Sequence, residues 1–353
     1  MIIARRPPSN YDALGWPDLV WLVKWLAEGF TMISRRLFLA FGAAGLATAG
    51  GVVSISNSYS EALAAARKRV ESYGSKVIES RFGPLEYAEA GTGEPVLMIH
   101  GSGGGCDQGM LFAAPLVEHG MRVISPSRFG YLGSAFPADP SSENQADALV
   151  DLLDALGIDR MPVIGGSAGA LSAIAFAIRH PDRCSALIAV VPAAYVPNRP
   201  SARPWGAIET SIAKAALRSD FIFWAAIAGI PEVMIGTILA TDPKLLDTAS
   251  AQDRARVDEV LRSILPVSDR ADGLMNDMQL AGNPQPMALE EITAPTLAIS
   301  FEDDRYLTAD AARHIAASVA GAKLVVYPTG GHVWIGHDAE MFAAIGEFIR
   351  QAI

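Results

Sequence analysis

Short apolar runs alternate with amphipathic segments along the chain from residue 76 onward. Eight of these runs have the length and the β-branched or aromatic content of strands: 76–82, 85–89, 95–100, 122–125, 161–165, 186–191, 296–300 and 323–327. Gly83 and Pro84 separate the first two runs and predict an opening hairpin. Strands that alternate with helices are typical of a mostly parallel sheet covered by helices.

The spacing of apolar positions between the strands predicts helices. Residues 141–156 carry apolar side chains at helical spacing, with Ser141 or Ser142 as the N-cap and Gly157 as the C-cap. Residues 168–179 are apolar nearly all round, which predicts a buried helix. Further helices are expected at 309–320 and 339–351. The pattern predicts an α/β fold with a mostly parallel, eight-stranded-type sheet flanked by helices.

The alternation of strands and helices breaks between residues 193 and 290, where helical stretches such as 208–217 and 251–263 occur among Pro and Trp residues. We interpret residues 193–290 as a helical lid inserted into a core formed by residues 76–192 and 291–353. Its large apolar side chains form either the lid's own core or the wall of a substrate pocket: Trp205, Phe221, Phe223, Trp224, Met234 and Met275. Trp205 and Trp224 are our candidates for substrate contact.

A charged segment followed by an apolar one precedes the predicted core. Ser34-Arg35-Arg36-Leu37-Phe38-Leu39 opens an apolar run, 37–53, that is rich in Ala and Gly. An arginine pair followed by x-Phe-Leu resembles a twin-arginine export signal, which a receptor reads as an address. Small-x-small cleavage candidates are 47–49 and 62–64. We therefore expect an exported protein, periplasmic or secreted, that contacts a membrane only through an uncleaved signal.

The N-terminal segment leaves two alternatives open. A run of 17 residues with low polarity approaches the ~18–20 that cross a bilayer, so an uncleaved segment would tether the protein to a membrane. Translation starts either at Met1 or at Met32, which lies just before the arginine pair. The amphipathic stretch 16–30 is given no function. We treat residues 1–50 as an extension with a signal and residues 51–75 as a linker or helix.

Composition and charge exclude several classes of protein. With 50% hydrophobic and 19% charged residues, the chain is neither disordered nor collagen-like. Lys and Arg total 28 against 38 for Asp and Glu, and no basic run occurs, so nucleic acid is not an expected partner. We expect a small-molecule substrate as the partner, and the sequence indicates no oligomeric state.

The cysteine and histidine content argues against a metal centre. Cys106 and Cys184 form no C-x-x-C motif and are expected to be small packed residues, although they allow one disulfide. No cluster of His, Asp and Glu has the spacing of metal ligands. We therefore expect no metal and no cofactor.

Residues 165–169, Gly-Gly-Ser-Ala-Gly, match G-x-S-x-G between a predicted strand and a predicted helix. A nucleophile elbow needs this context, because the serine sits on a strained strand-to-helix turn whose neighbours must be small. The alternative is a Gly-rich turn that matches by chance. The context favours Ser167 as a nucleophile.

A second glycine-rich element, His100-Gly101-Ser102-Gly103-Gly104-Gly105, directly follows a predicted strand. Glycines in such a loop let the backbone approach a substrate and turn an N–H group toward a developing oxyanion, and we expect Gly103 to contact substrate. A phosphate-binding loop is the alternative. It is disfavoured because no Lys-Ser/Thr follows, and because G-x-G-x-x-G with a following helix and acidic residue is not indicated.

A nucleophilic serine needs an imidazole within hydrogen-bond reach, and the imidazole needs a carboxylate that fixes its tautomer. Of six histidines, only His332 lies in a Gly-rich loop directly after a late strand, where a side chain reaches over the C-terminal edge of a sheet. His337 is the alternative, although its position is more typical of the start of the last helix. Three carboxylates, Glu302, Asp303 and Asp304, follow the seventh predicted strand.

Taken in order, the strand with His-Gly-x-Gly-Gly, the serine motif, the acidic loop and Gly-Gly-His resemble the α/β-hydrolase family, whose chain order is Ser, Asp, His. The resemblance implies Ser167 as the nucleophile, His332 as the base and Asp304 as the acid. Asp303 is the alternative acid, because Phe301 departs from the family's usual Gly.

The resemblance covers roughly residues 76–353 and implies an oxyanion hole. By position in the motifs, its donors should be the backbone N–H groups of Ser102 and Ala168. Residues 127–134 resemble the turn that follows the family's next strand, and we expect this turn to shape the wall of the cleft.

The leading hypothesis is a cofactor-free serine hydrolase that acts on a carboxylic ester of a small apolar substrate through an acyl-enzyme. A carbon–carbon bond hydrolase or a perhydrolase would use the same triad, so both remain alternatives. A non-catalytic ligand-binding relative is a second alternative, disfavoured because every triad residue is present. Serine rather than Asp at the nucleophile position disfavours a dehalogenase.

Overall fold

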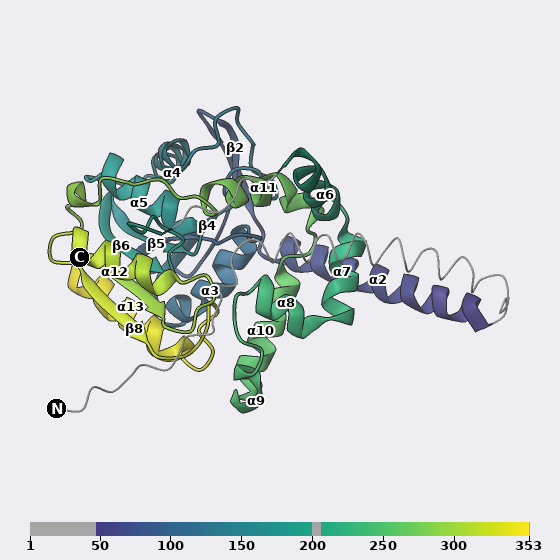
Figure 1. Cartoon of the computed structure of the whole chain (residues 1–353). Coiled ribbons are helices and arrows are strands. Elements are labelled where there is room, and N and C mark those ends of the chain that lie inside the picture. The colour runs from purple at the N-terminus through teal and green to yellow at the C-terminus, as the bar shows by residue number, and fades with distance from the viewer. Residues whose placement is uncertain (1–46, 200–205, 353) are drawn as a thin grey trace, which may run out of the picture.

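The computed structural model describes residues 47–199 and 206–352, and Figure 1 shows an α/β core with a group of helices beside it. The strands are β1 (Lys76–Ser80), β2 (Gly83–Ala90), β3 (Pro95–Ile99), β4 (Arg122–Pro126), β5 (Met161–Gly166), β6 (Cys184–Val190), β7 (Thr296–Phe301) and β8 (Lys323–Tyr327). The arginine pair, the stretch 16–30 and Trp205 lie outside the described residues.

The strands form one eight-stranded sheet in the order β1-β2-β4-β3-β5-β6-β7-β8. β1 and β4 both pair antiparallel with β2, whereas the pairs from β4 across to β8 are parallel. The mostly parallel sheet predicted from the sequence is therefore confirmed, and each observed strand end lies within two residues of its predicted place. The carboxyl ends of β3, β5, β7 and β8 consequently meet at one edge.

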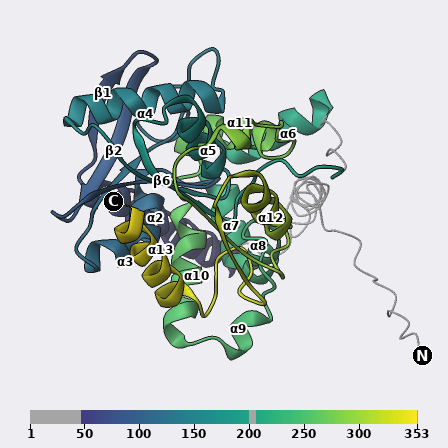
Figure 2. The ribbon, with the colours of Figure 1, turned by 90° about the vertical axis from the view of Figure 1, so that its left-hand side faces the viewer.

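Five helices cover the two faces of the sheet: α3 (Cys106–Glu118), α4 (Ser142–Leu156), α5 (Gly169–Arg179), α12 (Thr308–Ser318) and α13 (Asp338–Ala352). Alternation along β3 separates the layers, because successive side chains of a strand point to opposite faces. Val96 and Met98 pack in the cluster with α3 and α13, whereas Leu97 and Ile99 pack in the cluster with α4, α5 and α12. Figure 2 shows α3 and α13 together, apart from α4 and α5.

The ends of α4 follow the predicted capping residues. The Ser141 hydroxyl accepts a hydrogen bond from the Asn144 N–H, and Gly157 ends the helix in the left-handed conformation with φ 65°. The helix α3, by contrast, was not indicated by the sequence, since its apolar pattern directly follows the glycine loop and contains Pro115. A helix therefore does follow the glycine loop, but the Lys-Ser/Thr and the G-x-G-x-x-G pattern of a phosphate-binding loop are both missing.

Among the residues described between β6 and β7, which omit 200–205, there are six helices: α6 (Ala207–Leu217), α7 (Asp220–Gly229), α8 (Pro231–Thr237), α9 (Leu245–Thr248), α10 (Ala251–Ser263) and α11 (Ala271–Leu280), with short 3₁₀ turns at Ser268–Arg270 and Leu289–Glu291. They have an apolar core of their own, which includes Phe223, Met234 and Leu261. Val333 and Ile335, from the loop after β8, join that cluster. The inserted helices therefore pack over the edge where the strands end.

A long helix, α2 (Ala47–Ser72), precedes β1. Its C-terminal part contacts α7, and Ala66 is buried in the core of the inserted helices, while its N-terminal part projects away from the domain in Figure 1. Among the described helices, no single one has the length and apolarity of a bilayer span, although the bent pair α7 and α8 meets these two criteria together.

Candidate active site

Ser167 occupies the turn between β5 and α5 in a strained backbone conformation. Its φ is +51°, a left-handed value that non-glycine residues rarely adopt, and its N–H donates to the Val190 carbonyl at 2.9 Å. The turn requires small neighbours: a Cβ on Gly169 would lie 2.4 Å from the His100 carbonyl oxygen. The sequence G-x-S-x-G thus folds as the elbow that presents the Ser167 hydroxyl at the sheet edge.

His332 and Asp304 complete a line of hydrogen bonds with this serine. The Ser167 hydroxyl lies 2.9 Å from His332 Nε2, and His332 Nδ1 lies 2.8 Å from Asp304 Oδ2. Asp304 is 1% exposed and His332 is 8% exposed. With Asp304 ionised, Nδ1–H donates to the carboxylate and leaves Nε2 to accept the serine proton. The structure therefore brings together the three residues that the sequence nominated.

The two neighbouring aspartates have separate partners. Asp304 faces His332 and also accepts hydrogen bonds from the Tyr306 N–H at 2.8 Å and from the Thr308 hydroxyl. Asp303 accepts instead from the backbone N–H groups of Gly330 and Gly331, at 3.2 and 2.8 Å. Between the two candidates left open by the sequence, the geometry favours Asp304 as the partner of the imidazole. Asp303 instead fixes the loop that carries His332.

The histidine loop is also held by a residue that sequence reasoning missed. The His332 N–H donates to the Thr241 hydroxyl at 2.9 Å, and Thr241 lies between α8 and α9 in the inserted helices. Gly331 has φ +64° and packs so closely that a Cβ there would lie 2.5 Å from Thr241 Cγ2. No local pattern marks Thr241, because its partner is 91 residues away.

Two other residues of this region have different roles. His337, the alternative base, lies against the Tyr327 ring and contacts Glu340, just before α13 begins. Tyr306 packs edge-on against the His332 ring at 5.0 Å between centroids. The Tyr306 hydroxyl donates to the Thr237 carbonyl at 3.1 Å, and burial raises the pKa of this phenol. Tyr306 thus packs against the imidazole while its hydroxyl is tied to the end of α8 in the inserted helices.

The two nominated oxyanion donors flank Ser167. Ser102 lines the same cavity as Ser167, and Ala168 directly follows the nucleophile. The glycine loop lies close to the elbow, because a Cβ on Gly101 would be 3.1 Å from the Ser167 Cβ. Within the part of the chain that the structure describes, the N–H groups of Ser102 and Ala168 donate to no other protein group. They are therefore available to an oxygen atom of a ligand.

A buried arginine holds the glycine loop from behind. The Arg128 guanidinium donates to the His100 and Gly101 carbonyls at 3.0 and 3.1 Å, and forms a bidentate pair with Asp277 of α11 at 2.7 and 2.6 Å. The Tyr131 hydroxyl also donates to Asp277, at 2.5 Å. Burial, with the Arg128 charge as a lesser cause, holds the pKa of His100 well below its ordinary value. None of residues 127–134 lines the cavity, so instead of forming its wall, as expected, this turn supports the glycine loop through Arg128.

A second buried pair holds the other end of the loop. Arg270, which has 0% exposure, contacts both carboxylate oxygens of Asp107 at 3.0 and 2.8 Å and donates to the Gly104 carbonyl. Arg69 of α2 lies 3.6 Å from Asp107 and donates to the Ser263 and Leu265 carbonyls. The first turn of α3 is therefore fixed from two directions.

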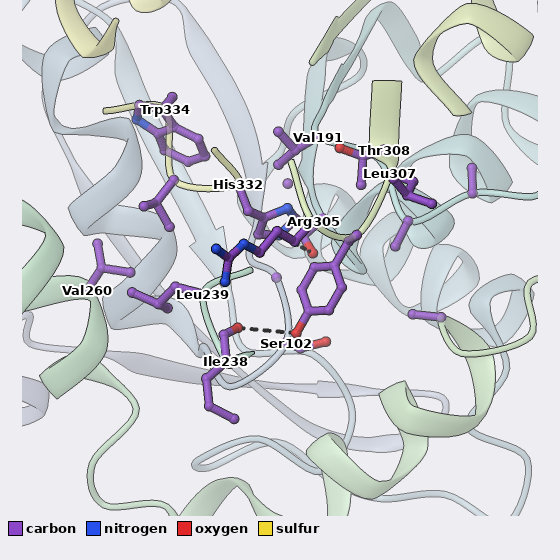
Figure 3. Close-up of a pocket in the computed structure, with 18 of the residues that line it drawn as sticks. Ser102, Val191, Ile238, Leu239, Val260, Arg305, Leu307, Thr308, His332 and Trp334 are labelled. Carbon is purple, nitrogen blue, oxygen red and sulfur yellow. Dashed lines mark hydrogen bonds between the residues drawn. The ribbon is translucent and has the colours of Figure 1, made fainter. Parts of the chain in front are cut away.

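A cavity of about 360 Å³ opens in front of Ser167 and His332. Figure 3 shows His332, Ser102 and Arg305 around its centre, with apolar side chains beside them. Its apolar wall includes Phe112, Val191, Leu239, Val260, Ile264 and Trp334. Such a wall suits an apolar organic molecule of small size.

The structure places two of the expected substrate-contact residues away from this wall. Trp224 packs against Tyr59 of α2, with 5.5 Å between ring centroids, and is not part of the cavity lining. The Gly103 N–H donates to the Tyr131 hydroxyl at 3.3 Å, and Gly103 lies beside Ile264, behind the lining. Trp205, the third such residue, falls outside the described residues. Trp224 therefore packs between helices α7 and α2 and does not contact the cavity.

The cysteines and acidic residues form no alternative centre in the described chain. Cys106 and Cys184 are buried and unpaired with each other, and burial raises the pKa of each thiol to about 12. Residues 47–199 and 206–352 contain no group of His, Cys, Asp and Glu side chains that could hold a metal ion.

Comparisons with known proteins agree with this geometry. A sequence model of the family described as alpha/beta hydrolase fold matches residues 94–335. The chain is 33% identical over 270 residues to a 2-hydroxy-6-oxononadienedioate/2-hydroxy-6-oxononatrienedioate hydrolase of Paraburkholderia xenovorans, covering 73% of this chain and 87% of that protein. A protein of the same description from Dechloromonas aromatica is 31% identical, with 70% and 84% covered.

Among solved structures, an alpha/beta hydrolase fold protein from Nakamurella multipartita superposes with a TM-score of 0.62 at 27% identity. The match covers 78% of this chain and 99% of that one. The family match over residues 94–335 spans β3 to β8 and the described helices between them, the inserted ones included.

Proposed function

The chain belongs to the α/β-hydrolase fold family and is a hydrolase, and from this premise we propose that it works through a Ser167–His332–Asp304 triad. The observation that carries the proposal is the continuous hydrogen-bonded line from Ser167 Oγ through His332 to Asp304, at 2.9 and 2.8 Å, on the wall of an apolar cavity. No cofactor takes part in the proposed reaction.

In the proposed mechanism, His332 Nε2 removes the hydroxyl proton as Ser167 Oγ attacks the carbonyl carbon of the substrate. The carbonyl oxygen becomes an oxyanion and accepts hydrogen bonds from the Ser102 and Ala168 N–H groups; each such donor is worth about 2.7–4 kcal/mol in measured enzymes. His332 then protonates the leaving group, and an acyl-enzyme remains on Ser167. Water, deprotonated by His332, hydrolyses it. Asp304 holds the imidazole tautomer throughout.

The substrate that we propose is a carboxylic ester of a small apolar compound, because the cavity of about 360 Å³ is mainly apolar and opens on the serine. A carbon–carbon bond hydrolase is the second candidate. The names of the two relatives at 33% and 31% identity favour it, and the same triad would serve that reaction.

The test compares the wild-type protein with Ser167→Ala on a series of p-nitrophenyl esters of increasing chain length and on a 2-hydroxy-6-oxodienoate. We expect the wild type to turn over one of these two substrate classes, and the turnover of that class to fall by ~10⁴-fold or more in the variant, since this is the effect of losing a triad nucleophile. Ester turnover supports the first candidate, and cleavage of the dienoate alone supports the second. Full activity in Ser167→Ala, or no labelling of Ser167 by a fluorophosphonate in the wild type, would contradict the triad.

We also propose export through a twin-arginine route, on the basis of the Arg35-Arg36 pair and the apolar run that follows it. Replacing both arginines with lysine keeps the positive charge and removes the recognised pair. We expect the variant to accumulate inside the cell, as measured by fractionation and immunoblotting. Equal export of the variant would contradict this proposal.

A further inference from the structure

Gln108 is a buried polar residue on the cavity wall that the proposed mechanism does not use. It lies in the first turn of α3, is 4% exposed and belongs to the cavity lining. Its backbone N–H bonds to the Gly105 carbonyl at 3.1 Å, but its carboxamide makes no hydrogen bond with any described residue. Its amide atoms are absent from the fully enclosed, unpartnered polar atoms, so they face the cavity and can bind a ligand group there.

Apart from Ser102, whose hydroxyl also makes no hydrogen bond with a described residue, the other polar side chains of the lining have protein partners. The Thr308 hydroxyl donates to Asp304, and the Trp334 indole N–H donates to Asp338 at 2.7 Å. Arg199 and Arg305 are paired with carboxylates, namely Asp310 at 3.6 Å and Asp242 at 3.3 Å. The Gln108 carboxamide therefore differs from these groups in having both its donors and its acceptor free toward the cavity.

The first turn of α3 that carries Gln108 is fixed, and the carboxamide lies beside the glycine loop. Its oxygen packs against Gly104, where a Cβ would lie 2.5 Å from Gln108 Oε1 and equally close to His100 Nδ1. The preceding residue, Asp107, is fixed by the buried Arg270 at 2.8 Å. A polar group that is positioned before binding loses little freedom when a ligand arrives, which is the condition for a strong contribution to specificity.

We propose that Gln108 binds a second oxygen atom of the substrate, a ketone or hydroxyl oxygen beyond the carbonyl that Ser167 attacks. The substrate class is then an apolar carbonyl compound with one further neutral oxygen. The amide nitrogen donates to a ketone oxygen, and the amide oxygen accepts from a hydroxyl. This inference rests on the proposed function, because it places the substrate in the cavity in front of Ser167.

The experiment uses p-nitrophenyl hexanoate and three analogues with a ketone oxygen at C3, C4 or C5 of the acyl chain. We expect the wild type to prefer at least one ketone over the plain ester in kcat/KM. Gln108→Met, which keeps the volume and removes the polar atoms, should lower that preference by at least 10-fold. Gln108→Glu should lower it too, because a carboxylate cannot donate to a ketone, and should spare the corresponding hydroxy ester.

Phe112→Leu provides the matched control on the same wall, because it changes shape without removing a polar group. We expect it to change the plain and ketone esters by similar factors. An unchanged preference in Gln108→Met, or no preference for any oxygenated ester in the wild type, would overturn the role of Gln108.

Measuring binding without turnover distinguishes a failure of the Gln108 role from a failure of the proposed function. In a Ser167→Ala background the intact esters are not consumed, and calorimetry measures their dissociation constants directly. Tighter binding of a ketone ester that is lost on adding Gln108→Met supports the Gln108 role whatever the reaction proves to be. Equal binding of the plain and ketone esters contradicts it, even if wild-type turnover requires Ser167.

Discussion

The two walls of the cavity are built in different ways. On the sheet side, Ser167, Asp304 and His332 follow β5, β7 and β8 directly, so parallel strands bring them to one edge. On the other side, the inserted helices are joined to the core by buried ion pairs. Arg128 and Asp277 are 149 residues apart in sequence, and Arg270 and Asp107 are 163 apart.

The two walls therefore have different tasks: the residues at the sheet edge are placed to react, and the ion pairs hold the glycine loop in position. The sheet edge carries the groups that can exchange a proton, and their positions follow from the strands. The ion pairs hold the glycine loop at both ends, because Arg128 binds the His100 and Gly101 carbonyls and Arg270 binds the Gly104 carbonyl. Substitutions in the triad at the sheet edge should therefore lower the rate of the reaction. Substitutions in the buried ion pairs should mainly lower the free energy of unfolding.

The largest effect should come from Asp304→Asn. An amide in place of the carboxylate favours the wrong imidazole tautomer, and a comparable change lowers kcat by about 10⁴-fold in a serine protease. Asp303→Asn is the matched control, because its remaining amide oxygen still accepts from Gly331. We expect it to reduce kcat far less, as measured by steady-state kinetics on the best ester. Equal losses in the two variants would contradict the assignment of Asp304.

Breaking an ion pair on the opposite wall tests the other half of the contrast. Arg128→Met leaves the Asp277 carboxylate buried without its partner, and we expect about 3–5 kcal/mol of destabilisation in urea unfolding. Arg270→Met should also destabilise the protein, but by less, because Arg69 still lies 3.6 Å from Asp107. The double variant Arg128→Met/Asp277→Leu removes both charges and should recover much of the loss. A single variant within ~1 kcal/mol of the wild type would show that the pair does not support this wall.

A smaller, pH-dependent effect is expected from His100. Burial and the nearby Arg128 charge lower the pKa of His100 in the folded protein, so the native state keeps it neutral. The unfolded chain binds a proton at this residue below about pH 6.5, so its contribution to stability is complete above that pH and decreases as the pH falls. The slope should approach ~1.4 kcal/mol per pH unit.

Urea unfolding between about pH 5 and 7 measures this slope. His100→Gln removes the titrating group while keeping a donor and an acceptor, and should therefore have a shallower pH dependence than the wild type. Identical slopes for the two proteins would mean that His100 does not titrate on unfolding.

Local sequence carries much of the information for the sheet wall. The glycines around Ser167 fit only a tight strand-to-helix turn, and Ser141 and Gly157 end α4 by contacts within a few residues. The strands were predicted within two residues because their apolar runs are short and bounded by turn residues. The resemblance to a known family then supplied the pairing of Asp304 with His332, for which sequence alone left Asp303 open.

The opposite wall could not be predicted in this way. Asp277 looks like an exposed helix residue in sequence, and only the three-dimensional fold shows that it is 1% exposed and paired with Arg128. Trp224 has the apolar character of a pocket residue, but its position depends on α2, more than 150 residues earlier in the chain. Contacts of such long range leave no periodic pattern, whereas a turn or a cap does.

The smallest effect should come from an ion pair exposed on the core. Arg81, in the β1–β2 turn, contacts Asp151 of α4 at 2.5 Å, with the Arg81 side chain 55% exposed. Water screens this pair, so Arg81→Met should cost only about 0.2–1 kcal/mol in the same urea assay, against several times more for Arg128→Met. Both replacements remove one guanidinium from a close arginine–aspartate pair; they differ in burial and in the two carbonyl contacts that Arg128 alone makes. A loss at Arg81 as large as that at Arg128 would mean that pairing, rather than burial of the charge left behind, determines how strongly the inserted helices are held.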